Sequence, residues 1–319
     1  MQMVRFKEYK MSRLMLGTVQ FGLNYGIANK AGQPTPKDVR EMLAYAIKNG
    51  VNCLDTAAAY GCSEEVIGRA LAELDAAGRV TVVTKVCTIA DGLGAGEADR
   101  LVEESVRRSL QRLRLDVLPV CIFHMDRNFC YMDSLLKARD KGLVRHVGVS
   151  AGNLPGPVVK MLASRKIEAM QIPTNMQIPT NMLDLRHLKA GVFGDAGRAG
   201  IAVFVRSVYL QGLIMMPEAD FFAEIRPLLP VRRKLEALAR DAGLTMAEMA
   251  LRYVLSIDGV TCVLTGVESI RQLSENVALF SKGPIEPSLV RAIIDAVPEM
   301  PEKALTPPMW PQELIMKSK

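Results

Sequence analysis

Eight short apolar runs recur along the chain, and helix-length amphipathic stretches separate most of them. Short apolar runs of this kind are typical of buried strands, and apolar residues spaced three or four apart are typical of helices. Strands that alternate with helices tend to form a parallel sheet, and eight such units predict an α/β fold, the (β/α)8 TIM barrel. The expected strands are Leu14–Gly17, Val51–Leu54, Val80–Thr84, Val117–Phe123, His146–Ser150, Ile167–Ile172, Ala202–Arg206 and Thr261–Thr265.

The chain is expected to form a single domain over residues 1–319. No Pro/Ser-rich linker divides it, and 49% hydrophobic residues suffice for a large core. The segment Val208–Pro230 and the Pro-rich tail from Pro298 onward are predicted to lie over the barrel mouth. A hexamer, Met170–Asn175, is repeated at once as Met176–Asn181, which lengthens the loop after the sixth expected strand.

Charge and cysteine usage exclude several classes of protein. The 40 Lys+Arg and 34 Asp+Glu give a net charge of +6, but the charges are scattered, which indicates mild attraction for anions and no nucleic-acid partner. No apolar run approaches the roughly 18 to 20 residues of a membrane helix. The six cysteines show no CxxC spacing and the N-terminus shows no apolar signal segment, so we expect a cytoplasmic protein with free thiols. The sequence leaves the oligomeric state open.

Polar side chains stand where three expected strands end. Asp55 and Tyr60 follow the second strand, Lys85 the third and His124 the fourth. The carboxyl ends of barrel strands meet at one face, so these four groups should converge there. A lysine cation favours the phenolate of a nearby tyrosine and so lowers its pKa, and a carboxylate can hold that lysine in place. Tyr60 is then a general acid and His124 a donor to a carbonyl oxygen. The alternative is a structural ion pair beside two pocket-edge residues.

Motifs spread over residues 14 to 280 make the chain resemble the aldo-keto reductase superfamily. They are Leu16–Gly22, Asp55–Ala57, Tyr60–Glu64, Thr84-Lys85, His124, Gly142–Ser150, Met170-Gln171, Arg206-Ser207, Gln211–Leu213 and Gly266–Asn276. The resemblance implies hydride transfer between a nicotinamide cofactor and a small-molecule carbonyl. It also implies that Tyr60 donates the proton, that Lys85 lowers the pKa of Tyr60, that Asp55 supports Lys85, and that His124 orients the carbonyl.

The resemblance extends to residues that bind the cofactor. Ser150 and Gln171 match positions that hold the nicotinamide carboxamide, although Gln177 in the repeated hexamer is the alternative to Gln171. Arg206 stands where many members stack an aromatic ring on the nicotinamide, and a planar guanidinium can also stack. The remaining positions expected to contact the cofactor are Gly17, Thr18, Ser207, Gln211, Gly212, Gly266, Glu268, Gln272, Glu275 and Asn276.

The type of cofactor depends on residues 266–276. The family favours NADPH, whereas Glu268 falls where phosphate-binding members often carry arginine. A carboxylate there repels a 2′-phosphate and can accept from a 2′-hydroxyl, which favours NADH. With Arg271 close by, we expect NADPH, with NADH as the alternative.

Three further sequence features are weighed against this interpretation. Gly92–Gly96 has GxGxG spacing and does not follow its strand directly, so we expect a rim loop and no dinucleotide fold. Cys121 and His124, three residues apart on a strand, point to opposite faces, and no metal site is expected. Phe129, Tyr131 and Trp310 are expected to line the substrate pocket, with loop anchoring as the alternative. A cofactor-binding regulatory subunit is the alternative function.

Overall fold

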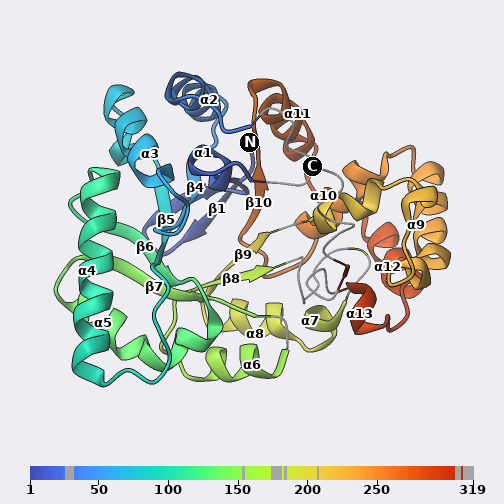
Figure 1. Ribbon diagram of the computed structural model, residues 1–319. Coiled ribbons are helices and arrows are strands. Elements are labelled where there is room, and N and C mark those ends of the chain that lie inside the picture. The colour runs from blue at the N-terminus through green and yellow to red at the C-terminus, as the bar shows by residue number, and fades with distance from the viewer. Residues whose placement is uncertain are drawn as a thin grey trace.

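A closed barrel of eight parallel strands forms the centre of the computed structural model (Figure 1). The structure describes residues 1–25, 32–152, 155–173, 182, 185–206, 208–305 and 310–311. The ring order β10-β3-β4-β5-β6-β7-β8-β9 means that each strand pairs with its successor and the last with the first. This confirms the predicted (β/α)8 barrel. The barrel strands are β3 (Leu14–Gly17), β4 (Cys53–Asp55), β5 (Thr81–Val86), β6 (Leu118–Phe123), β7 (Val144–Ser150), β8 (Ala169–Pro173), β9 (Ala202–Arg206) and β10 (Cys262–Gly266).

Helices surround the barrel and carry the chain back between strands (Figure 1). None of the described helices is both long and apolar enough to span a bilayer. The α-helices are α1 (Val19–Gly22), α2 (Pro36–Lys48), α3 (Ser63–Glu73), α4 (Ala95–Leu113), α5 (Met132–Asp140), α6 (Pro155–Ala163), α7 (Arg186–Lys189), α8 (Val192–Arg198), α9 (Leu229–Asp241), α10 (Met246–Leu255), α11 (Ile270–Ser281), α12 (Pro287–Ala296) and α13 (Glu302–Leu305). The short 3₁₀ helices are η1 (Ala77–Arg79), η2 (Asp126–Tyr131), η3 (Leu210–Met215), η4 (Glu218–Asp220) and η5 (Arg226–Leu228).

An N-terminal hairpin precedes the barrel and was not expected from the sequence. Strands β1 (Met3–Phe6) and β2 (Tyr9–Ser12) pair antiparallel through a two-residue turn at Lys7 and Glu8. Lys7 has a positive φ of 51°, a conformation that glycine or asparagine usually provides, so the turn lacks its usual sequence signature. Phe6 and Met11 of this hairpin pack with residues of the barrel interior, so the hairpin covers one end of the barrel.

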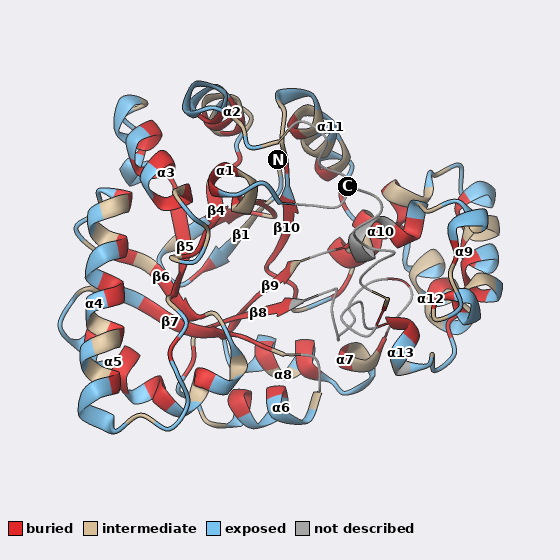
Figure 2. Cartoon of the chain, viewed as in Figure 1, coloured by how far each residue is buried: buried red, intermediate tan, exposed pale blue. Residues whose placement is uncertain are grey.

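Two hydrophobic cores follow from the alternation of side chains along each strand. The larger core lies between the strands and the helices, and the smaller one fills the barrel interior (Figure 2). On β9, for example, Val203 and Val205 belong to the outer core, whereas Ala202 and Phe204 belong to the inner one. Successive strand residues point to opposite faces, so inward-facing positions recur every second residue along each strand. The inward-facing positions at the carboxyl ends of the strands form the mouth of the barrel.

Candidate active site

The inward-facing positions at the carboxyl ends of the barrel strands are mostly polar. The same alternation that puts Cys53, Val83 and Ile122 in the inner core aims the residues two positions later at the mouth. This layer consists of Gly17, Asp55, Lys85, His124, Ser150, Gln171, Arg206 and Gly266. Each of these eight positions was expected from the sequence to bind cofactor or to take part in catalysis.

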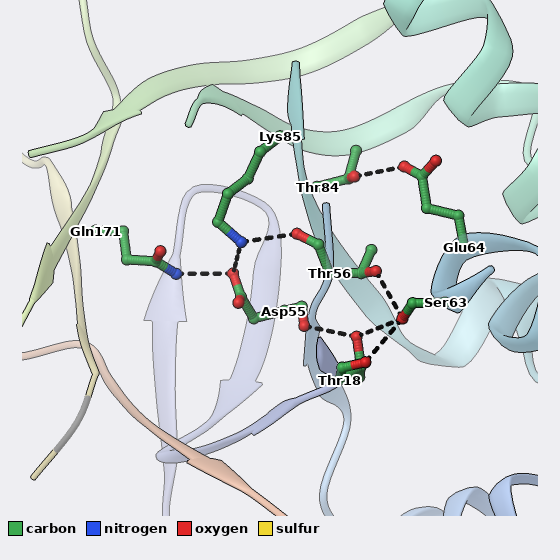
Figure 3. A network of polar contacts seen from close by, with 8 residues as sticks. All are labelled: Thr18, Asp55, Thr56, Ser63, Glu64, Thr84, Lys85 and Gln171. Carbon is green, nitrogen blue, oxygen red and sulfur yellow. Dashed lines mark hydrogen bonds and ion pairs between the residues drawn. The ribbon is translucent and has the colours of Figure 1, made fainter. Parts of the chain in front are cut away.

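Lys85 is the most deeply buried charge of the mouth and is held by two oxygens (Figure 3). Its Nζ donates to Oδ1 of Asp55 and to the backbone oxygen of Thr56, each at 2.7 Å, and the side chain is fully buried. Gln171 from β8 donates its Nε2 to the same Oδ1 of Asp55, also at 2.7 Å. A carboxylate accepts several such bonds at once, so Asp55 fixes the position of both neighbours. The amide oxygen of Gln171 is left to accept a bond from elsewhere.

Tyr60 lies on a tight loop whose shape depends on two glycines. A β-carbon on Gly22 of α1 would lie 1.8 Å from the backbone oxygen of Tyr60. Gly61 has a φ of +54°, and a β-carbon there would lie 2.3 Å from the backbone oxygen of Gly22. Any larger residue at either position forces the backbones apart. The Gly22 and Gly61 contact therefore sets how far Tyr60 extends into the mouth.

Three hydroxyl groups join this loop to the strands beneath it (Figure 3). Ser63 donates to the backbone oxygen of Thr18 at 2.9 Å, and Thr56 donates to the Ser63 hydroxyl at 3.0 Å. Thr18 donates to the backbone oxygen of Asp55 at 2.8 Å. The Thr18 side chain, which we expected to contact the cofactor, is fully buried and used inside the protein. Ser63 is the first residue of α3.

A second buried carboxylate, Glu64, supports the strand that carries Lys85. It accepts from the Thr84 hydroxyl at 2.6 Å and lies 3.5 Å from the Arg112 guanidinium. Thr84 is the residue before Lys85, so its outward-facing side chain fastens β5 to α3. This structural role of Glu64 and Thr84 was not expected from the sequence. In the sequence the two residues were visible as a carboxylate and a threonine within motifs that were matched to the barrel mouth.

The rings of Tyr60 and His124 meet edge to face at the mouth. Their centroids are 5.6 Å apart with an interplanar angle of 81°, and Nζ of Lys85 lies 4.9 Å from the centroid of the Tyr60 ring. Tyr60, Lys85, Asp55 and His124 are thus brought together as the sequence predicted. The phenol and the imidazole therefore lie side by side, and each can donate a hydrogen bond.

The pKa of Tyr60 differs in direction from our expectation. Burial raises it above the ordinary value, and the charge of Asp55 adds to that rise. The positive charges of Lys85 and Arg206 oppose the rise without cancelling it. We expected Lys85 to lower the pKa of Tyr60. That expectation did not include the free-energy cost of burying a phenolate, which raises the pKa. In the protein without ligand, Tyr60 therefore carries its proton.

His124 is neutral over the physiological range. Burial, together with the positive charges of Lys85 and Arg206, lowers its pKa to about 3. A neutral imidazole still has one N–H donor, so it can bond a carbonyl oxygen without bringing a charge into the mouth. Burial likewise lowers the pKa of Arg206, while Tyr60, Asp55 and Tyr25 partly offset that effect.

The mouth also contains buried polar atoms that no protein group satisfies. Within the described part of the chain, Nε of Arg206 and Oε1 of Gln20 are buried without a hydrogen-bond partner. Gln20 was not singled out in the sequence. Its amide packs closely against Gly266, because a β-carbon at Gly266 would lie 2.7 Å from Nε2 of Gln20. Natural proteins rarely leave such groups unpaired unless a ligand or water completes them. A carboxamide, with both donors and an acceptor, fits these groups and the remaining oxygen of Gln171.

The helix that follows β10 is capped by Ser269, whose hydroxyl accepts from the backbone N–H of Gln272 at 3.3 Å. Gln272 in turn accepts from the backbone N–H of Glu268 at 2.8 Å. Asn276 donates to the Thr265 hydroxyl at 3.2 Å, and Glu275 pairs with Arg271 on the exposed side. Several side chains expected to contact the cofactor thus also hold the start of α11 in shape.

Some expected site residues fall on parts of the chain that are not described. Ser207 and Gln177 lie outside the described residues. Gln211 and Gly212 belong to η3, but only their backbone is described. Of the two glutamines left open by the repeated hexamer, Gln171 is the one with a described position, on β8.

The three aromatic residues expected to line the substrate pocket have contacts that hold loops. Tyr131 accepts from the backbone N–H of Leu93 at 2.9 Å and donates to the backbone oxygen of Ala90 at 3.2 Å. Trp310 is buried, donates to the backbone oxygen of Lys303 at 3.1 Å and stacks edge to face on Phe222. Phe129 is partly buried against the outer core. These contacts are those of the loop-anchoring alternative.

Comparison with known proteins decides the family. The family model described as "Aldo/keto reductase family" matches residues 13–297. The chain belongs to this family. It is therefore an oxidoreductase, and enzymes of this family use a nicotinamide cofactor.

Relatives of the chain cover nearly its whole length. It is 23% identical to a protein of Arabidopsis thaliana named as a probable voltage-gated potassium channel subunit beta, over 94% of this chain and 99% of that protein. It is 26% identical to L-galactose dehydrogenase of the same plant, over 93% of this chain and 94% of that one. A solved aldo-keto reductase of Bacillus halodurans, in its holo form, superposes with a TM-score of 0.76 at 21% identity, covering 95% of this chain and 99% of that one.

Proposed function

We propose that this aldo-keto reductase interconverts a small polar aldehyde or ketone and its alcohol, with Tyr60 as the proton donor. The observation that carries the proposal is the convergence of four side chains at one end of the barrel. Lys85 is bonded to Asp55 at 2.7 Å and lies 4.9 Å from the centre of the Tyr60 ring, which meets His124 edge to face. A protonated phenol and a neutral imidazole are the two donors that a carbonyl oxygen needs.

Each of the four residues has a distinct part in this mechanism. Tyr60 gives its proton to the oxygen of the reduced carbonyl, and His124 bonds and orients that oxygen. Lys85 stabilises the phenolate that remains, because a cation nearby favours the charged form. Asp55 holds Lys85 in place through their hydrogen-bonded ion pair. A nicotinamide cofactor would supply the hydride; Ser150 and Gln171 are proposed to hold its carboxamide, and Arg206 is proposed to stack on its nicotinamide ring.

The choice between NADPH and NADH is proposed from the start of α11. Glu268 comes directly before the cap Ser269, where the helix N-terminus favours an anion but the carboxylate does not. We propose NADPH, with Arg271 as the cation nearby and Glu268 as the residue that weakens the preference. Titration with both cofactors tests this, and clearly tighter binding of NADH would reverse it.

The substrate is proposed to be a polar carbonyl compound, and a sugar-like one is supported by the relative named L-galactose dehydrogenase. A cytoplasmic location is supported by the free cysteines. The relative named as a potassium channel subunit beta supports a second candidate, a cofactor-binding regulatory subunit with incidental turnover.

Single-turnover oxidation of bound cofactor separates the two candidates. Protein loaded with one equivalent of NADPH is mixed with a panel of polar aldehydes, and the loss of absorbance at the reduced nicotinamide band is followed. Complete oxidation by at least one aldehyde at a rate that rises with its concentration supports the enzyme. Unchanged cofactor with every aldehyde, together with a stable complex with a partner protein, supports the regulatory subunit.

A further inference from the structure

The charges at the barrel mouth do not balance. Lys85 and Asp55 form a buried ion pair at 2.7 Å and cancel each other. His124 is neutral, because burial lowers its pKa to about 3, and Tyr60 carries its proton. Arg206 has no acidic partner within the described part of the chain, and its Nε is buried without a hydrogen bond. Among the described residues of the site, one positive charge therefore remains uncompensated.

Arg206 directs this charge toward the reacting groups. It is the last residue of β9, two positions after the inner-core residue Phe204, and alternation aims it into the mouth. It pairs in register with Pro173, at the end of the strand that carries Gln171. The titratable groups that interact electrostatically with Arg206 are Tyr60, Asp55, His124 and, from the loop after α1, Tyr25. A guanidinium stays protonated in proteins, so this charge is permanent.

Hydride transfer changes the charge of the cofactor ring by one unit. The oxidised nicotinamide ring is a cation, and the reduced ring is neutral. A ring that reacts with the carbon whose oxygen Tyr60 bonds would have to approach it to within about 3–3.5 Å. Such a ring would share the buried region of Arg206, where charges interact more strongly than in water. A permanent cation in this region favours the neutral ring.

We propose that Arg206 biases this site toward oxidation of an alcohol, by favouring the reduced, neutral cofactor over the oxidised, cationic one. The proposal rests on the proposed function. In that direction the alcohol would lose a hydride from its carbon to the cofactor ring, which would become neutral. Its hydroxyl proton would leave to solvent through Tyr60, which is protonated before and after, and the alcohol would become a carbonyl. Arg206 also lowers the pKa of Tyr60 against the effect of burial, which makes the phenolate easier to form.

The ratio of dissociation constants for NADP⁺ and NADPH tests the proposal directly. The phosphates and the adenosine are the same in both forms, so their contacts cancel in the ratio. Binding of NADPH is measured by fluorescence and that of NADP⁺ by competition, for the wild type, Arg206→Met and Arg206→Lys. Arg233→Met, which removes an exposed arginine paired with Glu218 on the outside of the barrel, is the matched control.

We expect the wild type to bind NADPH at least about tenfold more tightly than NADP⁺, as two like charges a few ångströms apart imply. Arg206→Met should lose most of this preference, while Arg206→Lys, which keeps the charge, and Arg233→Met should retain it. In alcohol oxidation, the rise of activity with pH should move to higher pH in Arg206→Met, because Tyr60 loses a stabilising cation. A purely structural role would not separate Met from Lys in this way.

Two outcomes overturn the inference. The first is a wild type that binds NADP⁺ as tightly as NADPH, a result that needs no variant to fold. The second is a ratio that changes less than twofold in Arg206→Met. Either outcome leaves the proposed function standing, because both cofactor forms still bind. A wild type that binds neither NADPH nor NADH would instead refute the proposed function itself.

Discussion

The Asp55→Ala variant should be strongly destabilised. Removing Lys85 as well should cost less than the sum of the two single substitutions. Lys85 is fully buried and, among the described residues, Asp55 is its one charged partner, at 2.7 Å. Asp55→Ala therefore leaves a buried cation bonded to the Thr56 carbonyl. Breaking a buried ion pair from one side typically costs about 3–5 kcal/mol in the free energy of unfolding. Asp55→Ala also removes the carboxylate oxygen that accepts the hydrogen bond from Gln171. We expect the total cost of Asp55→Ala to lie within that range.

A double-mutant cycle isolates the ion pair from the other contacts. The variants are Asp55→Ala, Lys85→Met and the double variant, and each free energy of unfolding is measured by urea denaturation. We expect the double variant to be destabilised by at least about 1.5 kcal/mol less than the sum of the single variants, since it leaves no unpaired charge. Lys137→Met is the control, because the Lys137–Asp99 pair is as short, 2.6 Å, but largely exposed. Its cost should stay within about 1 kcal/mol.

Additive effects would contradict this account of the mouth. If the two single variants add to within about 0.5 kcal/mol, the two side chains do not interact in the folded protein. A cost for Asp55→Ala no larger than that of Lys137→Met would show that Lys85 is hydrated or neutral without its partner. Either result would remove the reason to assign Asp55 the support of Lys85.

Three further variants test other parts of the structure. Among the described residues, His187 is buried with both ring nitrogens unpaired, and burial together with the charge of Arg186 lowers its pKa to about 3. Its neutral form is therefore favoured on folding, and stability is lost as pH falls from about 6.5 toward 3. His187→Leu should raise the urea midpoint more at pH 5 than at pH 8, and an equal change at both pH values would contradict this. His146 bonds Glu8 of the hairpin at 2.9 Å, and hydrogen bonds and charges of Glu168 and Glu8 raise its pKa despite burial. The stabilisation that His146 contributes is present below pH 6.5 and is lost as pH rises through its raised pKa. His146→Gln should therefore speed hydrogen exchange of β1 and β2 more at pH 6 than at pH 9. Glu268→Arg should tighten binding of NADPH relative to NADH by about tenfold, and an unchanged ratio in a titration would remove Glu268 from cofactor selection.

The barrel was predictable from the sequence because its strands carry two signals at once. Segments such as Val117–Phe123 and Ala202–Arg206 are apolar runs of strand length, and each is followed by a helix with a regular apolar face. The same regularity predicted which polar residues meet at the mouth. Once Asp55, Lys85 and His124 end strands of one parallel barrel, their convergence follows from topology alone.

Features that depend on local geometry were not predictable. The hairpin at Lys7 has no glycine or asparagine in its turn, so no turn signal marked it. The Ser63 hydroxyl donates to the backbone oxygen of Thr18 across the loop, a contact that depends on the folded arrangement. The direction of the Tyr60 pKa depends on how much burial opposes two cations, and a sequence gives no measure of burial.

Proton donation by Tyr60 is the central claim, and comparison of Tyr60→Phe with Tyr45→Phe tests it most directly. Both variants delete one phenolic oxygen, and Tyr45 lies on α2 outside the barrel. With an aldehyde that the wild type reduces, we expect kcat of Tyr60→Phe to fall by about 10²–10⁴-fold while NADPH still binds, and Tyr45→Phe to match the wild type. Full carbonyl reduction by Tyr60→Phe would contradict the account.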